Sequence, residues 1–136
     1  MKFTPVAEGV YRIHLAWGNV YLLKADGRAA LIDTGLEKDR GDLVGALEEV
    51  GVKPGALEAV YLTHAHCDHA GSAAWFAQQG AKIIAHTAEA RYLGLPQRGY
   101  IGQGWKAWIR PHTAFIFAAG ERLFPVERHD LDEMVA

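Results

Sequence analysis

The 136-residue sequence predicts an α/β fold, an α+β layered arrangement in which helices pack on one face of a mixed sheet. Two observations predict it. Short apolar segments typical of strands alternate with segments of helical periodicity, and Asp26-Gly27 lies between two of the strands where a tight hairpin is expected. A chain of this length can bury one compact core, so we expect a single domain over residues 1–136.

The first strands are expected at residues 10–14, 19–24 and 29–33, and Thr34-Gly35 ends the third of them. The helix that follows is indicated by apolar residues at helical spacing before Gly51, namely Leu43, Val44, Leu47 and Val50. Because this helix presents one apolar face, we expect that face to pack on the sheet.

Strands and helices continue to alternate along the next part of the chain. After a turn at Lys53-Pro54-Gly55 we expect a strand at 59–63, a helix at 70–79, a strand at 82–85 and a helix from Thr87 to about Leu93. Glycine and proline are frequent from Gly94 to Thr113, which predicts a long loop, and residues 115–118 are a candidate last strand.

Composition narrows the class of function and the compartment. The 14 Lys and Arg residues nearly balance 16 Asp and Glu, which does not favour nucleic-acid binding. No apolar run is long enough to span a membrane, and residues 1–19 do not resemble a secretory signal. Cys67 is the only cysteine, so no internal disulfide can form. We therefore expect a cytoplasmic protein without a membrane partner.

Four potential metal ligands follow the strand at 59–63 within six residues: His64, His66, Asp68 and His69. Two residues apart in extended backbone, His64 and His66 can project to the same side. Asp68 and His69 come at the entry to the next helix, where the turning chain can aim them at a neighbouring point. Imidazole and carboxylate are ordinary zinc ligands, and two ions about 3.5 to 4 Å apart suit hydrolysis by an activated water.

Around this cluster the sequence resembles the metallo-β-lactamase superfamily, which includes glyoxalase II-like thioesterases, lactonases, phosphodiesterases, nucleases and β-lactamases. The resemblance covers about residues 10–90, and its motifs are Leu31-Ile32-Asp33-Thr34-Gly35 and the stretch from Thr63 to Gly71 with its His-x-His-x-Asp-His pattern. It implies that His64 and His66 help hold a first metal and that Asp68 and His69 help hold a second.

The resemblance also assigns a catalytic role to Asp68, as the partner of the attacking water. Asp33 matches a carboxylate beneath the site that can orient a ligand imidazole. An ordinary turn residue at the end of a strand is the alternative interpretation of Asp33.

The family fold is an αββα sandwich of two similar halves, and this chain is expected to be a truncated domain that supplies one half, with the motifs within about residues 10–90. The further ligands that the family takes from its second half have no matching motif here. The remaining histidines that could substitute are His86, His112 and His129, of which His112 lies in Pro111-His112-Thr113, a stretch that resembles the missing Gly-His-Thr-Pro-Gly-like loop. His14 and His86 are interpreted as residues at strand ends.

The first hypothesis is therefore a metal-dependent hydrolase that uses a metal-activated water on a small ester, thioester, lactone or phosphoester. Zinc is the expected cofactor, with two ions in a complete site, and iron or manganese are alternatives. A mononuclear-iron oxygenase of the same superfamily is the redox alternative. The second hypothesis is a split domain, inactive alone, that pairs with a second-half partner chain or with a second copy of itself.

Overall fold

The computed structural model describes residues 3–86, 89 and 133–135. Its strands are β1 (Phe3–Ala7), β2 (Val10–His14), β3 (Asn19–Ala25), β4 (Arg28–Ile32), β5 (Ala59–Leu62), β6 (Lys82–His86) and β7 (Glu133–Val135). Its helices are α1 (Arg40–Glu49), α2 (Cys67–Ala70) and α3 (Ala73–Gln78), with single 3₁₀ turns η1 (Glu37–Asp39) and η2 (Pro54–Ala56).

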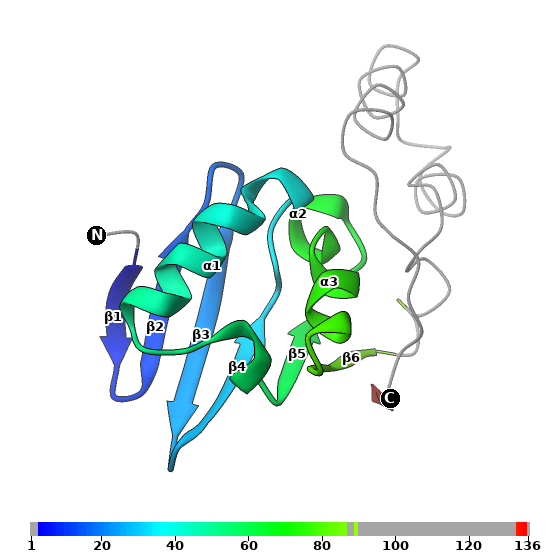
Figure 1. The fold of residues 1–136 in the computed structure, drawn as a ribbon. Coiled ribbons are helices and arrows are strands. Elements are labelled where there is room, and N and C mark those ends of the chain that lie inside the picture. The colour runs from blue at the N-terminus through cyan, green and yellow to red at the C-terminus, as the bar shows by residue number, and fades with distance from the viewer. Residues whose placement is uncertain (1–2, 87–88, 90–132, 136) are drawn as a thin grey trace.

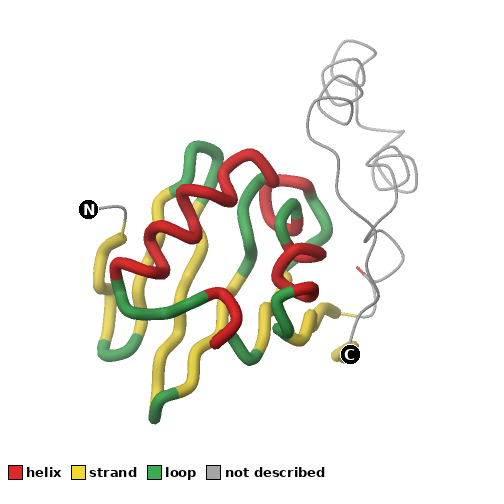
Figure 2. The backbone as a smooth tube through the Cα atoms, viewed as in Figure 1, coloured by secondary structure: helices red, strands yellow, loops and turns green. Residues whose placement is uncertain are grey.

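The strands form one mixed sheet of seven strands that follow one another in chain order (Figure 1). Strands β1 to β4 pair antiparallel, whereas β4, β5, β6 and β7 pair parallel. Parallel neighbours need a crossover, and the helices provide it: α1 connects β4 to β5, and α2 with α3 connects β5 to β6 (Figure 2). The predicted mixed sheet is confirmed.

The hairpin between β3 and β4 forms where Asp26-Gly27 predicts it. Both residues have positive φ angles, 51° at Asp26 and 77° at Gly27. Two successive positive values are the requirement of a type I′ turn, whose twist matches that of the flanking strands, and aspartate followed by glycine tolerates them best.

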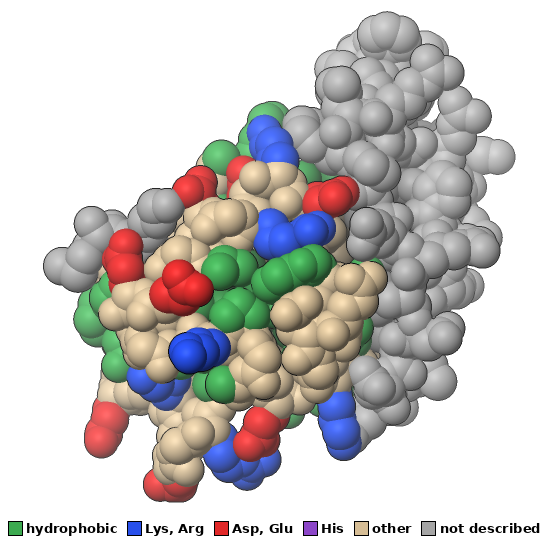
Figure 3. Space-filling model, viewed as in Figure 1, with side chains coloured by type: hydrophobic (Ala, Val, Ile, Leu, Met, Phe, Trp, Pro, Cys, Tyr) green, Lys and Arg blue, Asp and Glu red, His purple; other side chains and the backbone are tan. Residues whose placement is uncertain are grey.

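The helices of the described part cover one face of the sheet, with α1 crossing β2 and β3 in Figure 1 and α3 in front of β5 and β6. The core lies between these layers. Its fully buried members come from strands and helices alike and include Leu22, Leu31, Val60, Ile83, Leu43, Leu47 and Phe76. Acidic and basic side chains are interspersed over this face (Figure 3), and no described helix is long and apolar enough to cross a membrane.

Two expectations need correction. Strand β1 was not predicted: it is an edge strand with Pro5 at its centre and mostly exposed residues, so it lacks a buried alternating pattern. The helix expected over 70–79 is instead two short helices. The amides of Gly71 and Ser72 donate to Gly35 O and to Thr34 Oγ1, at 3.0 and 3.1 Å, which interrupts the helical hydrogen bonds.

Other expectations fall on residues that the structure does not describe. They are the long loop at 94–113, the strand at 115–118, and any ligand role of His112 or His129. Of the helix expected from Thr87 to about Leu93, only Glu89 is described, and it is helical.

Candidate metal centre

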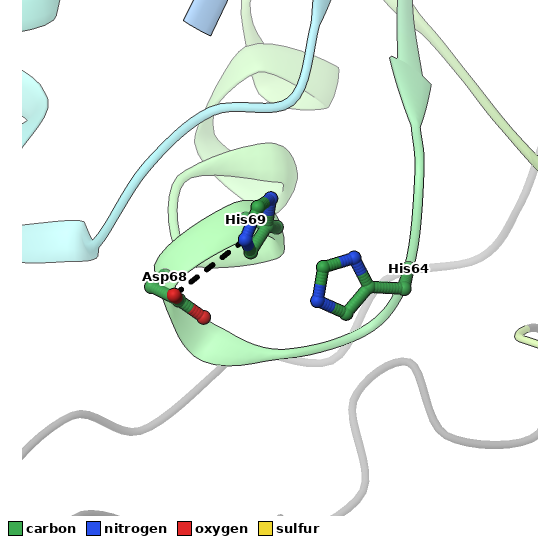
Figure 4. A group of neighbouring side chains, drawn as sticks. All are labelled: His64, Asp68 and His69. Atoms are coloured by element: carbon green, nitrogen blue, oxygen red, sulfur yellow. Dashed lines mark ion pairs between the residues drawn. The ribbon is translucent and has the colours of Figure 1, made fainter. Parts of the chain in front are cut away.

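The candidate ligands lie where the chain leaves the sheet and enters α2. Beyond β5 the segment 63–66 runs past the carboxyl end of the parallel strands, the edge at which such sheets place their sites. His66 is the last extended residue, with φ −65° and ψ 149°, and it caps α2. Asp68 and His69 are in the single turn of α2, so the change from extended to helical backbone brings them back toward His64 (Figure 4).

Three of the four predicted ligands meet at one point. Donor atoms of His64, Asp68 and His69 all lie within 4.8 Å of one another, and each of the three residues is half-buried. The ring centroids of His64 and His69 are 4.0 Å apart. The Asp68 Oδ2 atom lies 3.5 Å from His69 Nε2, the contact drawn in Figure 4. One cation can therefore be reached by two imidazoles and a carboxylate.

His66 lies beside this group rather than in it. Its ring contacts the His64 ring edge to face, with centroids 4.8 Å apart. The expected division of the ligands, with His64 and His66 on one metal and Asp68 and His69 on another, therefore stays a prediction.

Asp33 lies beneath the cluster and makes hydrogen bonds with both its oxygens. Its Oδ2 contacts His69 Nδ1 at 2.8 Å and accepts from Thr63 Oγ1 at 2.7 Å, while Oδ1 accepts from Thr63 N at 2.8 Å. Only 4% of Asp33 is exposed. A carboxylate on Nδ1 favours the tautomer that leaves Nε2 of His69 free to bind a metal. The structure thus places Asp33 in contact with the imidazole of His69, and its role in orienting a metal ligand stays a prediction.

The environment lowers the pKa of two of the imidazoles and raises the pKa of the third. Burial lowers the pKa of His64, and the neighbouring His69 ring lowers it further. Burial and the neighbouring His64 ring lower the pKa of His66 in the same way. The hydrogen bond with Asp33 raises the pKa of His69. The neutral form, which ligates metals, is therefore favoured at His64 and His66, and the ring of His69 is held in a fixed orientation by a buried carboxylate.

Sequence reasoning missed the residues that hold this arrangement together. Thr34 is fully buried, and its N–H and hydroxyl both donate to the carbonyl of His69, at 2.7 and 2.9 Å. Glu89 accepts from the amide of Ala65 at 3.0 Å, between the two histidines of the loop. Thr34 does adjoin Asp33 in the sequence, but nothing there indicates its partner 35 residues away.

The aromatic and cysteine side chains of the region have mixed environments. Phe76 is fully buried in the core, and Trp75 packs against it. Trp17 is 65% exposed, with the Lys38 ammonium 5.8 Å from its ring. Cys67, between His66 and Asp68, is half-buried.

Imidazoles and a carboxylate converging at the end of a parallel strand, with a second carboxylate behind one imidazole, define a metal-binding α/β protein. The family model of the metallo-β-lactamase superfamily matches residues 18–132, and the chain belongs to that family.

The sequence is similar to two curated relatives. It is 37% identical over 90 residues to metallo-β-lactamase domain-containing protein 1 of Homo sapiens, a match that covers 60% of this chain and 33% of that protein. It is 33% identical over 89 residues to a metal-dependent hydrolase of Myxococcus xanthus, covering 63% of this chain and 30% of that one.

Solved structures of the family share the fold. The subclass B3 metallo-β-lactamase BJP-1 of Bradyrhizobium japonicum superimposes with a TM-score of 0.78 and 19% identity, covering 100% of this chain and 46% of that one. The metallo-β-lactamase GOB-18 of Elizabethkingia meningoseptica gives 0.76 and 17%, covering 100% and 45%. The chain thus spans less than half of these enzymes and a third of the curated relatives, and the expected partial metallo-β-lactamase fold is confirmed.

Proposed function

We propose that this chain provides the metal-binding half of a hydrolase site that acts on a small ester, thioester, lactone or phosphoester. The observation that carries the proposal is the convergence of His64, Asp68 and His69 within 4.8 Å at the end of β5. The relative from Myxococcus xanthus, described as a metal-dependent hydrolase, supports the same class of reaction.

The residues present fit a zinc ion. His64 and His69 offer ring nitrogens, Asp68 offers a carboxylate oxygen, and Asp33 holds His69 with Nε2 toward the group. Burial lowers the pKa of His64 and of His66, which favours the neutral form that ligates a metal. A bound zinc would polarise the scissile carbonyl or phosphoryl group and lower the pKa of a water.

The side chains would then orient the attacking water and accept its proton. About a third of the Asp68 side chain is exposed, so its carboxylate can orient an attacking water and accept its proton. His64 and His69 hold their positions while this proton moves, because each is tied to a neighbour: His64 Nδ1 lies 3.0 Å from Thr63 Oγ1, and His69 is held by Asp33. Asp68 is thus the proposed catalytic residue.

The identity of the metal is part of the proposal. A site of imidazoles and carboxylates suits zinc, and also the iron or manganese used by other sites of this composition. Elemental analysis distinguishes the three metals. Iron as the resident metal, with consumption of oxygen, would favour the oxygenase alternative over hydrolysis.

The test is the metal content per chain of protein purified without chelator. We expect at least one zinc per chain in the wild type, and a large loss of metal in His64→Ala and in His69→Ala. The control is His14→Ala, which removes an exposed imidazole at the end of β2 and is expected to keep the metal. Wild-type protein that stays metal-free when excess zinc is added would refute the proposal.

His66 requires its own variant, because its ring lies beside the three-residue group. If it completes the ligand set, His66→Ala loses metal to the same extent as His64→Ala. If it does not, His66→Ala keeps its metal and only His64→Ala and His69→Ala show the loss.

A further inference from the structure

The amide between the two loop histidines is held by a side chain from another element. Pairing of β5 with β6 ends at Leu62 and Ala85, so residue 65 lies beyond the strand ladder. Its N–H donates to the Glu89 Oε2 atom at 3.0 Å. Its methyl group is fully buried in the core. Ala65 is therefore anchored through its side chain on one side and through its amide on the other.

Fixing Ala65 fixes the direction of both neighbouring imidazoles. In extended backbone, residues 64 and 66 project away from the side chain of residue 65. With the methyl group of Ala65 in the core, the two rings project the other way and contact each other at 4.8 Å. A rotation of this peptide would displace both rings together.

The anchor at Ala65 has a counterpart on the other side of His64. Thr63 donates from its amide and its hydroxyl to Asp33, at 2.8 and 2.7 Å. The loop is thus held by two carboxylates, Asp33 before His64 and Glu89 after it, which come from the end of β4 and from the helical residue that follows β6.

We propose that Glu89 is a positioning residue of the metal centre, whose carboxylate holds the His64-Ala65-His66 loop in the geometry that binds the cation. This inference rests on the proposed function, since it assumes that the cluster binds a metal.

The test compares Glu89→Ala with Glu89→Gln, using cobalt(II) as a spectroscopic probe in place of zinc. The alanine removes the acceptor, and we expect its cobalt dissociation constant to rise about tenfold with altered visible absorption bands. The glutamine oxygen can still accept from the Ala65 amide, so we expect wild-type bands and a smaller loss of affinity from the missing charge. Glu49→Ala, at an exposed position on α1, is the control and should match the wild type.

Hydrogen exchange of the Ala65 amide in metal-free protein gives a second readout. We expect faster exchange in Glu89→Ala and near wild-type exchange in Glu89→Gln, with circular dichroism confirming that all variants are folded. A Glu89→Ala protein with wild-type spectrum, cobalt affinity and exchange overturns the role of Glu89 while the proposed function stands. Wild-type protein that binds no cobalt overturns the proposed function and, with it, the positioning of a metal centre.

Discussion

Asp33 combines an unusual backbone conformation with three hydrogen-bond contacts of its carboxylate. Its φ of 63° is in the left-handed region, which few residues other than glycine adopt and which aspartate tolerates better than most. The conformation turns its carboxylate toward Thr63 and His69 rather than along the strand. A residue held this way at a site is typical of local strain retained for function.

Replacing this carboxylate by an amide should change the tautomer of His69. In Asp33→Asn, an amide NH₂ facing Nδ1 of His69 would force that nitrogen to accept, and the proton would move to Nε2, the atom that faces Asp68. We expect metal affinity to fall about 10- to 100-fold. Metal titration measures the loss, and nitrogen NMR of the ring reports the tautomer.

A matched control for this substitution is available in the same sheet. Asp26 also has a positive φ, 51°, but it lies in the hairpin turn between β3 and β4. Asp26→Asn should leave metal affinity unchanged. An equal loss in both variants would contradict the tautomer explanation.

Gly71 is required by space rather than by backbone conformation. Its φ of −60° is helical, which alanine adopts readily. A Cβ there would lie 2.5 Å from the Cys67 carbonyl oxygen, 2.7 Å from the Glu37 amide nitrogen and 2.8 Å from the Gly35 carbonyl oxygen. All three atoms are backbone, so none can move without displacing α2 or the loop that leads to α1.

We therefore expect Gly71→Ala to lower the free energy of unfolding by about 1 to 3 kcal/mol and to weaken metal binding as α2 shifts. Gly41→Ala is the matched control, because outside the backbone of its own helix no heavy atom lies within 4 Å of a Cβ at that position. It should be neutral or stabilising by up to about 1 kcal/mol. Urea denaturation measures both, and equal stabilities would refute the steric explanation.

At the scale of elements, the loop after β4 makes hydrogen bonds with the residues that directly follow the ligand-bearing helix α2. Thr34 and Gly35 accept from the amides of Ser72 and Gly71, and Ser72 Oγ donates to Leu36 O at 3.3 Å. These buried contacts replace hydrogen bonds that a continuous helix would make. The break between α2 and α3 therefore fixes α2, and with it Asp68 and His69, against the end of β4.

The opposite end of β4 carries an ion pair with a pH dependence that can be predicted. Arg28 Nε and Nη2 donate to the Glu58 carboxylate, at distances down to 2.7 Å, just before β5 begins. The hydrogen bond from Arg28 lowers the pKa of Glu58. A carboxyl group whose folded-state pKa is lowered contributes stability above its unfolded pKa, and this contribution is lost as pH falls through the folded-state value.

We expect Arg28→Gln to be slightly less stable than the wild type at neutral pH, and we expect this gap to close in acid, as pH falls through the lowered folded-state pKa of Glu58. Both side chains are solvent-exposed, so the difference should be small and should shrink in high salt. Lys53→Gln, which removes another exposed cation, should show no such pH-dependent gap. Urea denaturation at neutral and at acidic pH measures it, and a gap that persists in acid would contradict the assignment.

At the scale of the whole molecule, the helices of the described part leave one face of the sheet without a helical layer. Cross-strand neighbours Tyr21, Ile32, Tyr61 and Ile84 form an apolar row on that face. Tyr61, between the inward-facing Val60 and Leu62, is 45% exposed. This row fits the proposal that a second half, from a partner chain or a second copy, covers the face.

The mass of the protein in solution distinguishes these arrangements. Light scattering on the samples used for metal analysis shows whether metal is held by a monomer or only by an assembly. Metal found only in a dimer would favour pairing of two copies, and metal found only after a partner chain is added would favour a split domain.

Local patterns sufficed to predict much of the fold. Alternating apolar residues, helical spacing and the Asp26-Gly27 turn predicted strands β2 to β6 and α1, because each depends on neighbours in sequence. Edge strand β1 was not predicted, because its mostly exposed residues do not alternate between buried apolar and exposed polar positions.

The sequence by itself determined which residues could hold a metal, since His64, His66, Asp68 and His69 lie within six consecutive residues. Only the tertiary structure decided that His64, Asp68 and His69 converge, that His66 lies beside them, and that Asp33 and Glu89 brace the loop. The physical reason is distance along the chain: hydrogen bonds spanning 24 to 36 residues depend on how the strands are ordered and packed, which no local pattern encodes.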